Sequence, residues 1–145
     1  MLAAKVRVNT NRFRVQINEA KQSLRDFRPL FRILRDKWLI DAFRKVFSTD
    51  GRGIWPPTNR PNPILRDTRA LFRSYTQEGA RGNISRIGRK EFTWGSDIFY
   101  GEFHERGQGV RQRQVVGLIL SDRSNNRAIE QIIERYVEGK IGGRR

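Results

Sequence analysis

One segment, residues 30–47, constrains the fold most strongly. Its sequence LFRILRDKWLIDAFRKVF places apolar residues three and four apart, which is the spacing of one side of a helix. Pro29 suits the first turn of that helix, where a backbone N–H is not needed. The apolar side predicted to face a core comprises Leu30, Ile33, Leu34, Leu39, Ile40, Phe43, Val46 and Phe47.

The residues before this helix allow more than one structure. Residues 1–13 are polar and basic with a short alternation, which predicts either an edge strand or a flexible arm. From Phe13 the spacing favours a helix of about three turns that Pro29 ends or kinks. Its apolar face would contain Val15, Ile17, Ala20 and Leu24. A single kinked helix over 14–48 is equally compatible with the pattern.

After the helix, the chain alternates between loops and short elements. Asp50-Gly51 and Gly53 end the helix, and prolines make residues 48–63 a long loop. A short helix is predicted over 65–75, capped by Asp67 or Thr68. Apolar residues around a turn at 88–90 predict a β-hairpin within 83–96.

The C-terminal third predicts three further elements. Residues 97–109 favour one helical turn ending at glycines, and residues 111–120 are a candidate third strand. Apolar residues from Ile129 to Val137 follow a helical period, with Ser121 or Asp122 as the cap and Gly139 as the stop. A frayed tail follows this helix.

These elements together predict an α+β fold with long N-terminal helices, a small antiparallel β-sheet and a C-terminal amphipathic helix. The expected organisation is an arm over 1–13, a single domain over 14–141 and a basic tail over 142–145. Within that domain, the long Pro-rich loop occupies 49–63.

Charge and composition exclude several classes of site. The chain has 30 Lys and Arg residues against 15 Asp and Glu, a formal net charge of +15, and 24 of the basic residues are Arg. Such an excess predicts a polyanion or an acidic protein surface as a neighbour. Because the chain contains no Cys and one His, disulfides, Cys-based zinc sites and multi-His metal sites are excluded.

No motif predicts catalysis. His104 and Glu105 resemble the start of a zinc-protease helix, but position 108, where a second His is needed, is Gln. The glycines do not form a phosphate-binding loop and suit turns instead. The expectation is therefore a non-enzymatic protein without a catalytic residue, metal or cofactor.

The basic residues of the first half have two interpretations. They either track a nucleic-acid phosphate backbone, or form a solvated helix face that docks on an acidic protein. The candidates are Arg28, Arg32, Arg35, Arg44, Lys45, Arg60, Arg66, Arg69 and Arg73.

The aromatic residues supply candidate protein contacts. Trp55, Pro56 and Pro57 form a stiff segment in a polar loop, which either packs on its own core or anchors a partner. Trp94, together with Tyr100 and His104, is a candidate for a second interface.

Several segments in order resemble one protein family. An amphipathic helix runs into DGRGIWPPT, and ILRDTRALFRSYT, FTWGSDIFYGEFHERGQG and RQRQVVGLILSD follow at similar spacing. Together they resemble the Mu-type phage virion morphogenesis family, related to tail-completion and neck proteins, over residues 30–138. Arg69, Gly101 and Gln114-Val115 depart from the family pattern, and the segment before Pro29 has no counterpart in it.

The resemblance implies a structural virion protein of a tailed phage, made in the host bacterial cytoplasm. It would assemble as a ring of six or twelve copies at the head–tail junction and contact neighbouring neck, connector and tail-tube proteins. It also implies non-specific contact with genomic DNA in the lumen. No membrane association is expected, because no run in the sequence approaches 18 apolar residues. The alternative from the residues themselves is a small basic nucleic-acid-binding protein. Steep loss of DNA affinity with salt would distinguish that alternative.

Overall fold

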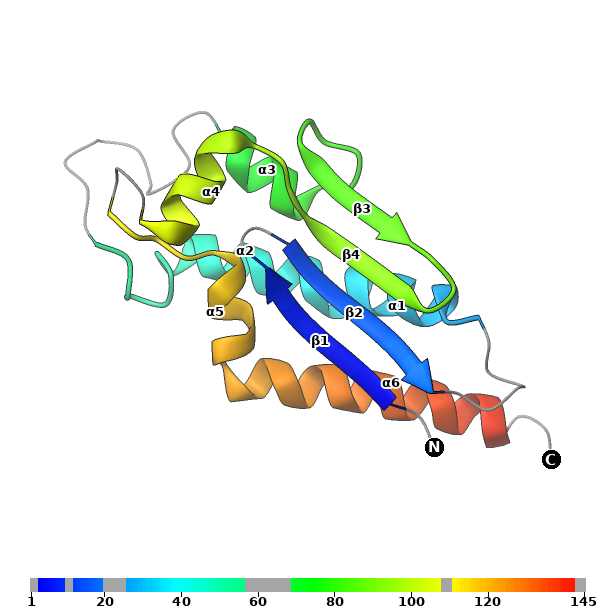
Figure 1. Cartoon of the computed structure of the whole chain (residues 1–145). Coiled ribbons are helices and arrows are strands. Elements are labelled where there is room, and N and C mark those ends of the chain that lie inside the picture. Colours follow the sequence, from blue (N-terminus) through cyan, green and yellow to red (C-terminus); the bar gives the residue numbers. More distant parts are fainter. Residues whose placement is uncertain (1–2, 10–11, 20–25, 57–68, 108–110, 143–145) are drawn as a thin grey trace.

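The computed structural model describes residues 3–9, 12–19, 26–56, 69–107 and 111–142, and confirms an α+β fold. Four strands form one sheet, and the other elements are helices, one of them a short π-helical segment, η1 (Figure 1). In chain order the elements are β1 (Ala3–Asn9), β2 (Arg12–Glu19), α1 (Arg28–Leu34), η1 (Arg35–Leu39), α2 (Ile40–Ser48), α3 (Ala70–Thr76), β3 (Asn83–Ile87), β4 (Glu91–Ser96), α4 (Phe99–Arg106), α5 (Val116–Ser121) and α6 (Arg123–Gly142).

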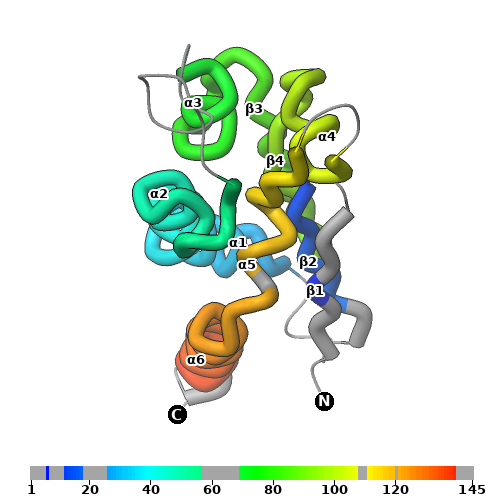
Figure 2. Tube along the Cα trace, turned by 90° about the vertical axis from the view of Figure 1, so that its left-hand side faces the viewer, coloured from blue at the N-terminus to red at the C-terminus, as the bar shows by residue number. Residues whose placement is uncertain are grey.

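The sheet is antiparallel throughout, with the strand order β1-β2-β4-β3. Helices α1, α2 and α6 lie on one side of it, and the other face of β1 and β2 is open (Figures 1 and 2). Phe13 and Val15 of β2 are fully buried, whereas Arg12 and Arg14 are partly exposed. This alternation is that of a strand with one face on the core and one face toward solvent.

The helix predicted from Phe13 is wrong, because residues 12–19 form β2. The apolar residues Phe13, Val15 and Ile17 alternate with polar ones and are all buried on one face of the sheet. The single kinked helix over 14–48 is wrong for the same reason. Residues 3–9, within the predicted arm, form an edge strand paired with β2. The other residues of the predicted apolar face, Ala20 and Leu24, lie outside the described residues.

The long helix is present but contains a wider turn. Pro29 occupies its first turn as predicted, and η1 then separates α1 from α2. Trp38 is buried there, and its Nε1 donates to Asn125 Oδ1 of α6 at 3.3 Å. Ile33, predicted to face the core, is 40% exposed instead.

The middle of the chain agrees with the sequence patterns. Strands β3 and β4 form the predicted hairpin around Gly88–Lys90. Helix α3 begins five residues after the predicted start and buries Leu71 and Tyr75. The predicted caps Asp67 and Thr68 lie outside the described residues. The residue before the helix is Arg69, whose backbone adopts the left-handed conformation.

The last third differs from the predictions in two places. The third strand expected over 111–120 is wrong, since residues 116–121 form the helix α5, where Glu105 of α4 accepts the N–H groups at its start. Helix α6 is capped by Asp122, as predicted, through hydrogen bonds from the N–H and hydroxyl of Ser124. It continues past Gly139 to Gly142, so Gly139 does not end it. Among the described residues, no helix is both long enough and apolar enough to cross a membrane.

Candidate functional site

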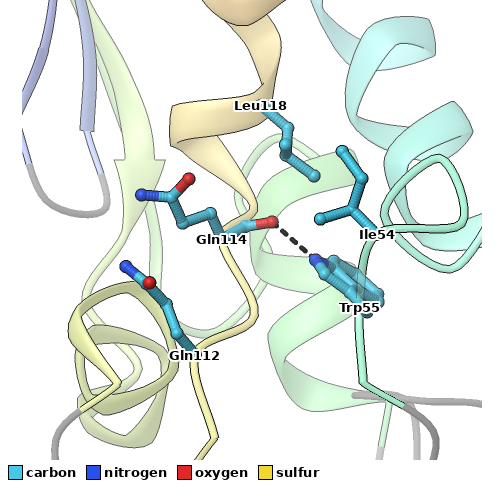
Figure 3. Close-up of a pocket in the computed structure, with 5 residues that line it drawn as sticks. All are labelled: Ile54, Trp55, Gln112, Gln114 and Leu118. Atoms are coloured by element: carbon cyan, nitrogen blue, oxygen red, sulfur yellow. Dashed lines mark hydrogen bonds between the residues drawn. The ribbon is translucent and has the colours of Figure 1, made fainter.

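Trp55 lies in the core and not on the surface. Its ring packs edge-on against Phe47 at 5.6 Å between centroids, and its Nε1 donates to the backbone oxygen of Gln114 at 2.7 Å (Figure 3). It is 5% exposed, so of its two predicted roles the structure shows the one in which the loop packs on its own core. The ring has no free surface with which to anchor a partner.

The residues next to Trp55 continue this docking of the loop. The Pro56 oxygen accepts two hydrogen bonds from the Arg113 guanidinium, at 3.1 and 2.9 Å. Ile54, in contrast, points outward with 62% exposure. Figure 3 shows it beside Trp55 and Leu118, among the residues that line a pocket formed by Ile54, Trp55, Gln112, Gln114 and Leu118. Pro57 and Arg60 lie outside the described residues.

Trp94 is likewise a core residue. It is fully buried in β4, and its Nε1 donates to the Tyr75 oxygen at 3.0 Å, which ties β4 to α3. The interface expectation for Trp94 is therefore replaced by a structural role. Tyr100 and His104, its predicted companions, are half-buried on α4.

The exposed aromatic side chains lie on helix α4, whereas Trp55 and Trp94 are buried. Phe99 is 73% exposed and Phe103 is 41% exposed, one turn apart on the same side of the helix. Their rings meet edge to face at 6.2 Å, and Phe99 also contacts Tyr100 at 5.6 Å. We call Phe99, Tyr100 and Phe103 the α4 aromatic face. The sequence signal for it was present, since two Phe residues four apart lie on one side of any helix.

The structure holds α4 firmly in place beneath this face. Gly101 lies against Leu71 of α3, where a Cβ atom would be 2.7 Å from Leu71 Cδ1. Gly107 ends the helix with a φ of +67°, a conformation that favours glycine. The following chain returns along the helix, and Arg113 N donates to the His104 oxygen at 2.8 Å.

Glu105 links α4 to α5 from inside the protein. Its Oε1 accepts the N–H groups of Val115 and Val116, both at 2.5 Å. Burial raises the pKa of Glu105 to about 7, although the backbone N–H groups of Val116, Val115 and Gly117 oppose that rise. Burial, with a smaller contribution from the Glu105 charge, also raises the pKa of Tyr75. No sequence signal identified Glu105, because its partners lie ten and eleven residues away.

The predicted basic residues do not form one uniform patch. Arg28, Arg35 and Arg44 are paired with Asp26, Asp36 and Asp41 at 2.6, 2.7 and 3.3 Å, and Arg35 also pairs with Glu78 at 2.7 Å. The Arg28 hydrogen bonds lower the pKa of Asp26 to about 2. Exposed positions with no ion pair among the described residues are Arg32, Lys45 and Arg73.

Two further predicted positions complete this set. Arg69 is exposed and lies over the Phe72 ring, with its guanidinium carbon 5.5 Å from the ring centre. Arg66 lies outside the described residues.

A second basic surface, which the sequence patterns did not single out, lies on the open face of the sheet. Arg12 and Arg14 of β2 and Arg86 of β3 occupy positions of this face. The alternation of Arg12 and Arg14 with buried residues in RFRVQI was a period-two signal that the helical interpretation hid.

The arrangement presents two surfaces suited to binding, one aromatic and one basic. Within the described ranges, no three His, Asp or Glu side chains gather where they could hold a metal ion. No family model, no curated protein and no solved structure matches the chain. The candidate sites are therefore defined by geometry alone, as the α4 aromatic face and the basic open face of the sheet.

Proposed function

We propose that this chain is a non-enzymatic structural protein of a tailed phage that acts by assembling at the head–tail junction. The observation that carries assembly is the α4 aromatic face, with Phe99 73% exposed and in contact with the Phe103 ring. Large exposed aromatic surface is costly in water and marks protein interfaces. In the proposed assembly, each copy buries this face against a different surface of the neighbouring copy.

The contacts beneath the face suit it to docking. Gly101 packs on Leu71, and Glu105 holds the start of α5, so the aromatic rings stand on a fixed helix. A preorganised surface loses little conformational entropy on binding. These contacts support a permanent interface.

A ring needs two different complementary surfaces on each subunit, because a head-to-tail contact closes only by rotation. The α4 aromatic face supplies one of them in this proposal. Ile54, exposed on the loop after α2, supplies the apolar part of the other. This assignment replaces Trp55, which is buried, with its outward-pointing neighbour.

The head–tail location rests on the resemblance of residues 30–138 to the Mu-type virion morphogenesis family. On this proposal the ring has six or twelve copies and serves as a neck, tail-completion or tail-terminator layer. Its neighbours are other neck, connector and tail-tube proteins, and it is made in the host cytoplasm before joining the virion. The chemistry is docking, without cofactor, metal or membrane.

Sedimentation of the purified chain tests the assembly step. The double variant Phe99→Ser/Phe103→Ser should shift the oligomer to monomer while the circular dichroism spectrum stays that of the parent. Ile33→Ser is the matched control, because Ile33 is exposed to nearly the same extent as Phe103 but lies on α1. An oligomer that survives the double variant would remove the α4 aromatic face from the proposal.

The second candidate is a small basic nucleic-acid-binding protein that acts as a monomer. The arginines on the open face of the sheet favour it, and so does the net charge of +15. The two candidates differ in oligomeric state, since a monomer in every condition tested would favour the second one. They also differ in salt response, because apolar assembly persists where phosphate contacts weaken.

A further inference from the structure

We infer that the open face of the sheet is a nucleic-acid-binding surface that contacts phosphates through Arg12, Arg14 and Arg86. The inference is independent of the assembly role and deepens the second candidate function, since it names the residues that contact the nucleic acid and places them on a different part of the fold from the α4 aromatic face. It also differs from the basic helix surface predicted from the sequence. The register of the strands carries it.

The three arginines occupy neighbouring positions on one face of the sheet. Arg14 pairs with Thr93 of β4, and Arg86 pairs with the same Thr93 from the other side. Because neighbouring strands lie about 4.8 Å apart, the two arginine backbones flank Thr93 at a separation of about 10 Å. Arg12 lies two positions along β2, so its side chain projects to the same face.

The charge on this face is only partly neutralised. Glu91 of β4 contacts Arg14, with Oε1 3.4 Å from Nε. Both side chains are well exposed, and such pairs are weak and exchange partners readily. In the described part of the chain, Arg12 and Arg86 make no ion pair with a carboxylate, unlike Arg28, Arg35 and Arg44 on the helices.

The geometry favours nucleic acid over an acidic protein. Guanidinium groups spaced across one face of a sheet match a ligand with anions repeated along its length, and each strand of DNA carries one charge per ~3.4 Å of helix axis. Arginine also offers the planar fork that phosphate oxygens accept. A flat sheet face meets the backbone and does not enter a groove, so the binding is independent of base sequence.

Helix α4 stands at one end of this sheet, where β4 ends and β2 begins (Figure 1). Strand β2 has α1, α2 and α6 on one side only, as Figure 2 shows. A nucleic acid can therefore approach the arginines without displacing any of these three helices.

Fluorescence anisotropy with a labelled 20-nucleotide single strand of mixed sequence, and with the matching duplex, tests the inference across a series of NaCl concentrations. The triple variant Arg12→Gln/Arg14→Gln/Arg86→Gln should weaken binding at least tenfold at low salt. It should also make the plot of log binding constant against log NaCl concentration less steep by about two to three units. Each arginine removed loses one phosphate contact, and each lost contact changes the slope by about one unit.

A matched variant separates this surface from net charge alone. The variant Arg32→Gln/Arg44→Gln/Lys45→Gln removes an equal number of positive charges, but from α1 and α2. It should change the salt slope by less than about one unit. Glu91→Gln should increase DNA affinity, a result that unfolding of the variant cannot produce. By releasing Arg14 from its carboxylate, it should strengthen DNA binding and steepen the salt slope.

Several outcomes would overturn the inference. One is an unchanged slope in the sheet variant, and another is an equal reduction in the helix variant. A third is labelled poly-glutamate that binds as tightly as DNA through the same arginines, which would make the surface a site for acidic protein. Sedimentation of the sheet variant keeps this result separate from the proposed function, since weakened DNA binding with intact assembly leaves the ring proposal standing.

Discussion

Trp55 lies directly over the backbone of Gly51. A Cβ atom at position 51 would overlap Cδ1 of the Trp55 ring, and Gly51 itself has a φ of +66°. The turn after α2 thus uses glycine for two reasons, a left-handed backbone and contact with an indole. This pairing turns residues 51–56 back onto the core.

Gly51→Ala should therefore destabilise the protein severely. The left-handed backbone costs a non-glycine residue about 1–2 kcal/mol, and the overlap with Trp55 adds about 1–3 kcal/mol. The free energy of unfolding from urea denaturation measures the sum. Gly53→Ala is the control, since Gly53 has a φ of +77° but no atom within 4 Å of its Cβ position. Equal destabilisation in the two variants would disprove the close packing at Gly51.

Trp55→Ala should act through stability and not through partner binding. Removing a buried indole costs about 3–5 kcal/mol, and here it also leaves the Gln114 oxygen without its hydrogen bond. We expect a lower urea midpoint. A variant that keeps the stability of the parent but no longer assembles would return Trp55 to the interface.

Glu105 should give the protein an unusual pH dependence. Its pKa is raised from 4.5 to about 7 by burial, so the folded state holds this proton more tightly than the unfolded chain does. The stabilisation is complete below pH 4.5 and is lost as pH rises through about 7. It is on the order of 3 kcal/mol. Urea denaturation at closely spaced pH values across this window measures it.

Glu105→Gln should flatten that profile, because the amide oxygen still accepts from Val115 and Val116 but carries no charge. Glu102→Gln, on the same helix and paired with Arg106, should keep the parent profile. The carboxyls of Asp36 and Asp122, whose pKa values are lowered by hydrogen bonds from Arg35 and Ser124, titrate below this window. A profile unchanged by Glu105→Gln would contradict the assignment.

The elements that could be predicted are those whose own residues indicate their structure. The hairpin around Gly88–Lys90 and the helix after Pro29 follow from turn residues and from apolar spacing. The cap of α6 at Asp122 also follows from local chemistry. Such signals need no knowledge of the remaining chain.

The errors have a common physical cause. Residues 12–17 satisfy an alternating pattern, but Val15, Ile17, Ala20 and Leu24 fit a helical one, and only the pairing with β4 selects the strand. Residues 115–119 are largely apolar and suit either conformation, and Glu105 selects the helix from ten residues away. In both segments, tertiary contacts determine whether the chain forms a strand or a helix.

The candidate site was harder to predict than the fold. Trp55 and Trp94, which the sequence made candidate interface residues, are buried in the core. Their large rings fill space there, and their indole N–H groups donate to backbone oxygens. Phe99 and Phe103 remained outside because α4 is anchored through Gly101 and Glu105 on its other side. Residue type alone does not reveal that anchoring.

The proposed function places this gene in a tailed phage, and electron microscopy of particles made after the gene is deleted tests that proposal most directly, with plasmid-borne variants supplied in trans. We predict filled heads beside separate tails. The parent chain and Ile33→Ser should restore joined virions, and Phe99→Ser/Phe103→Ser should not. Normal, joined virions in the absence of the gene would contradict the account.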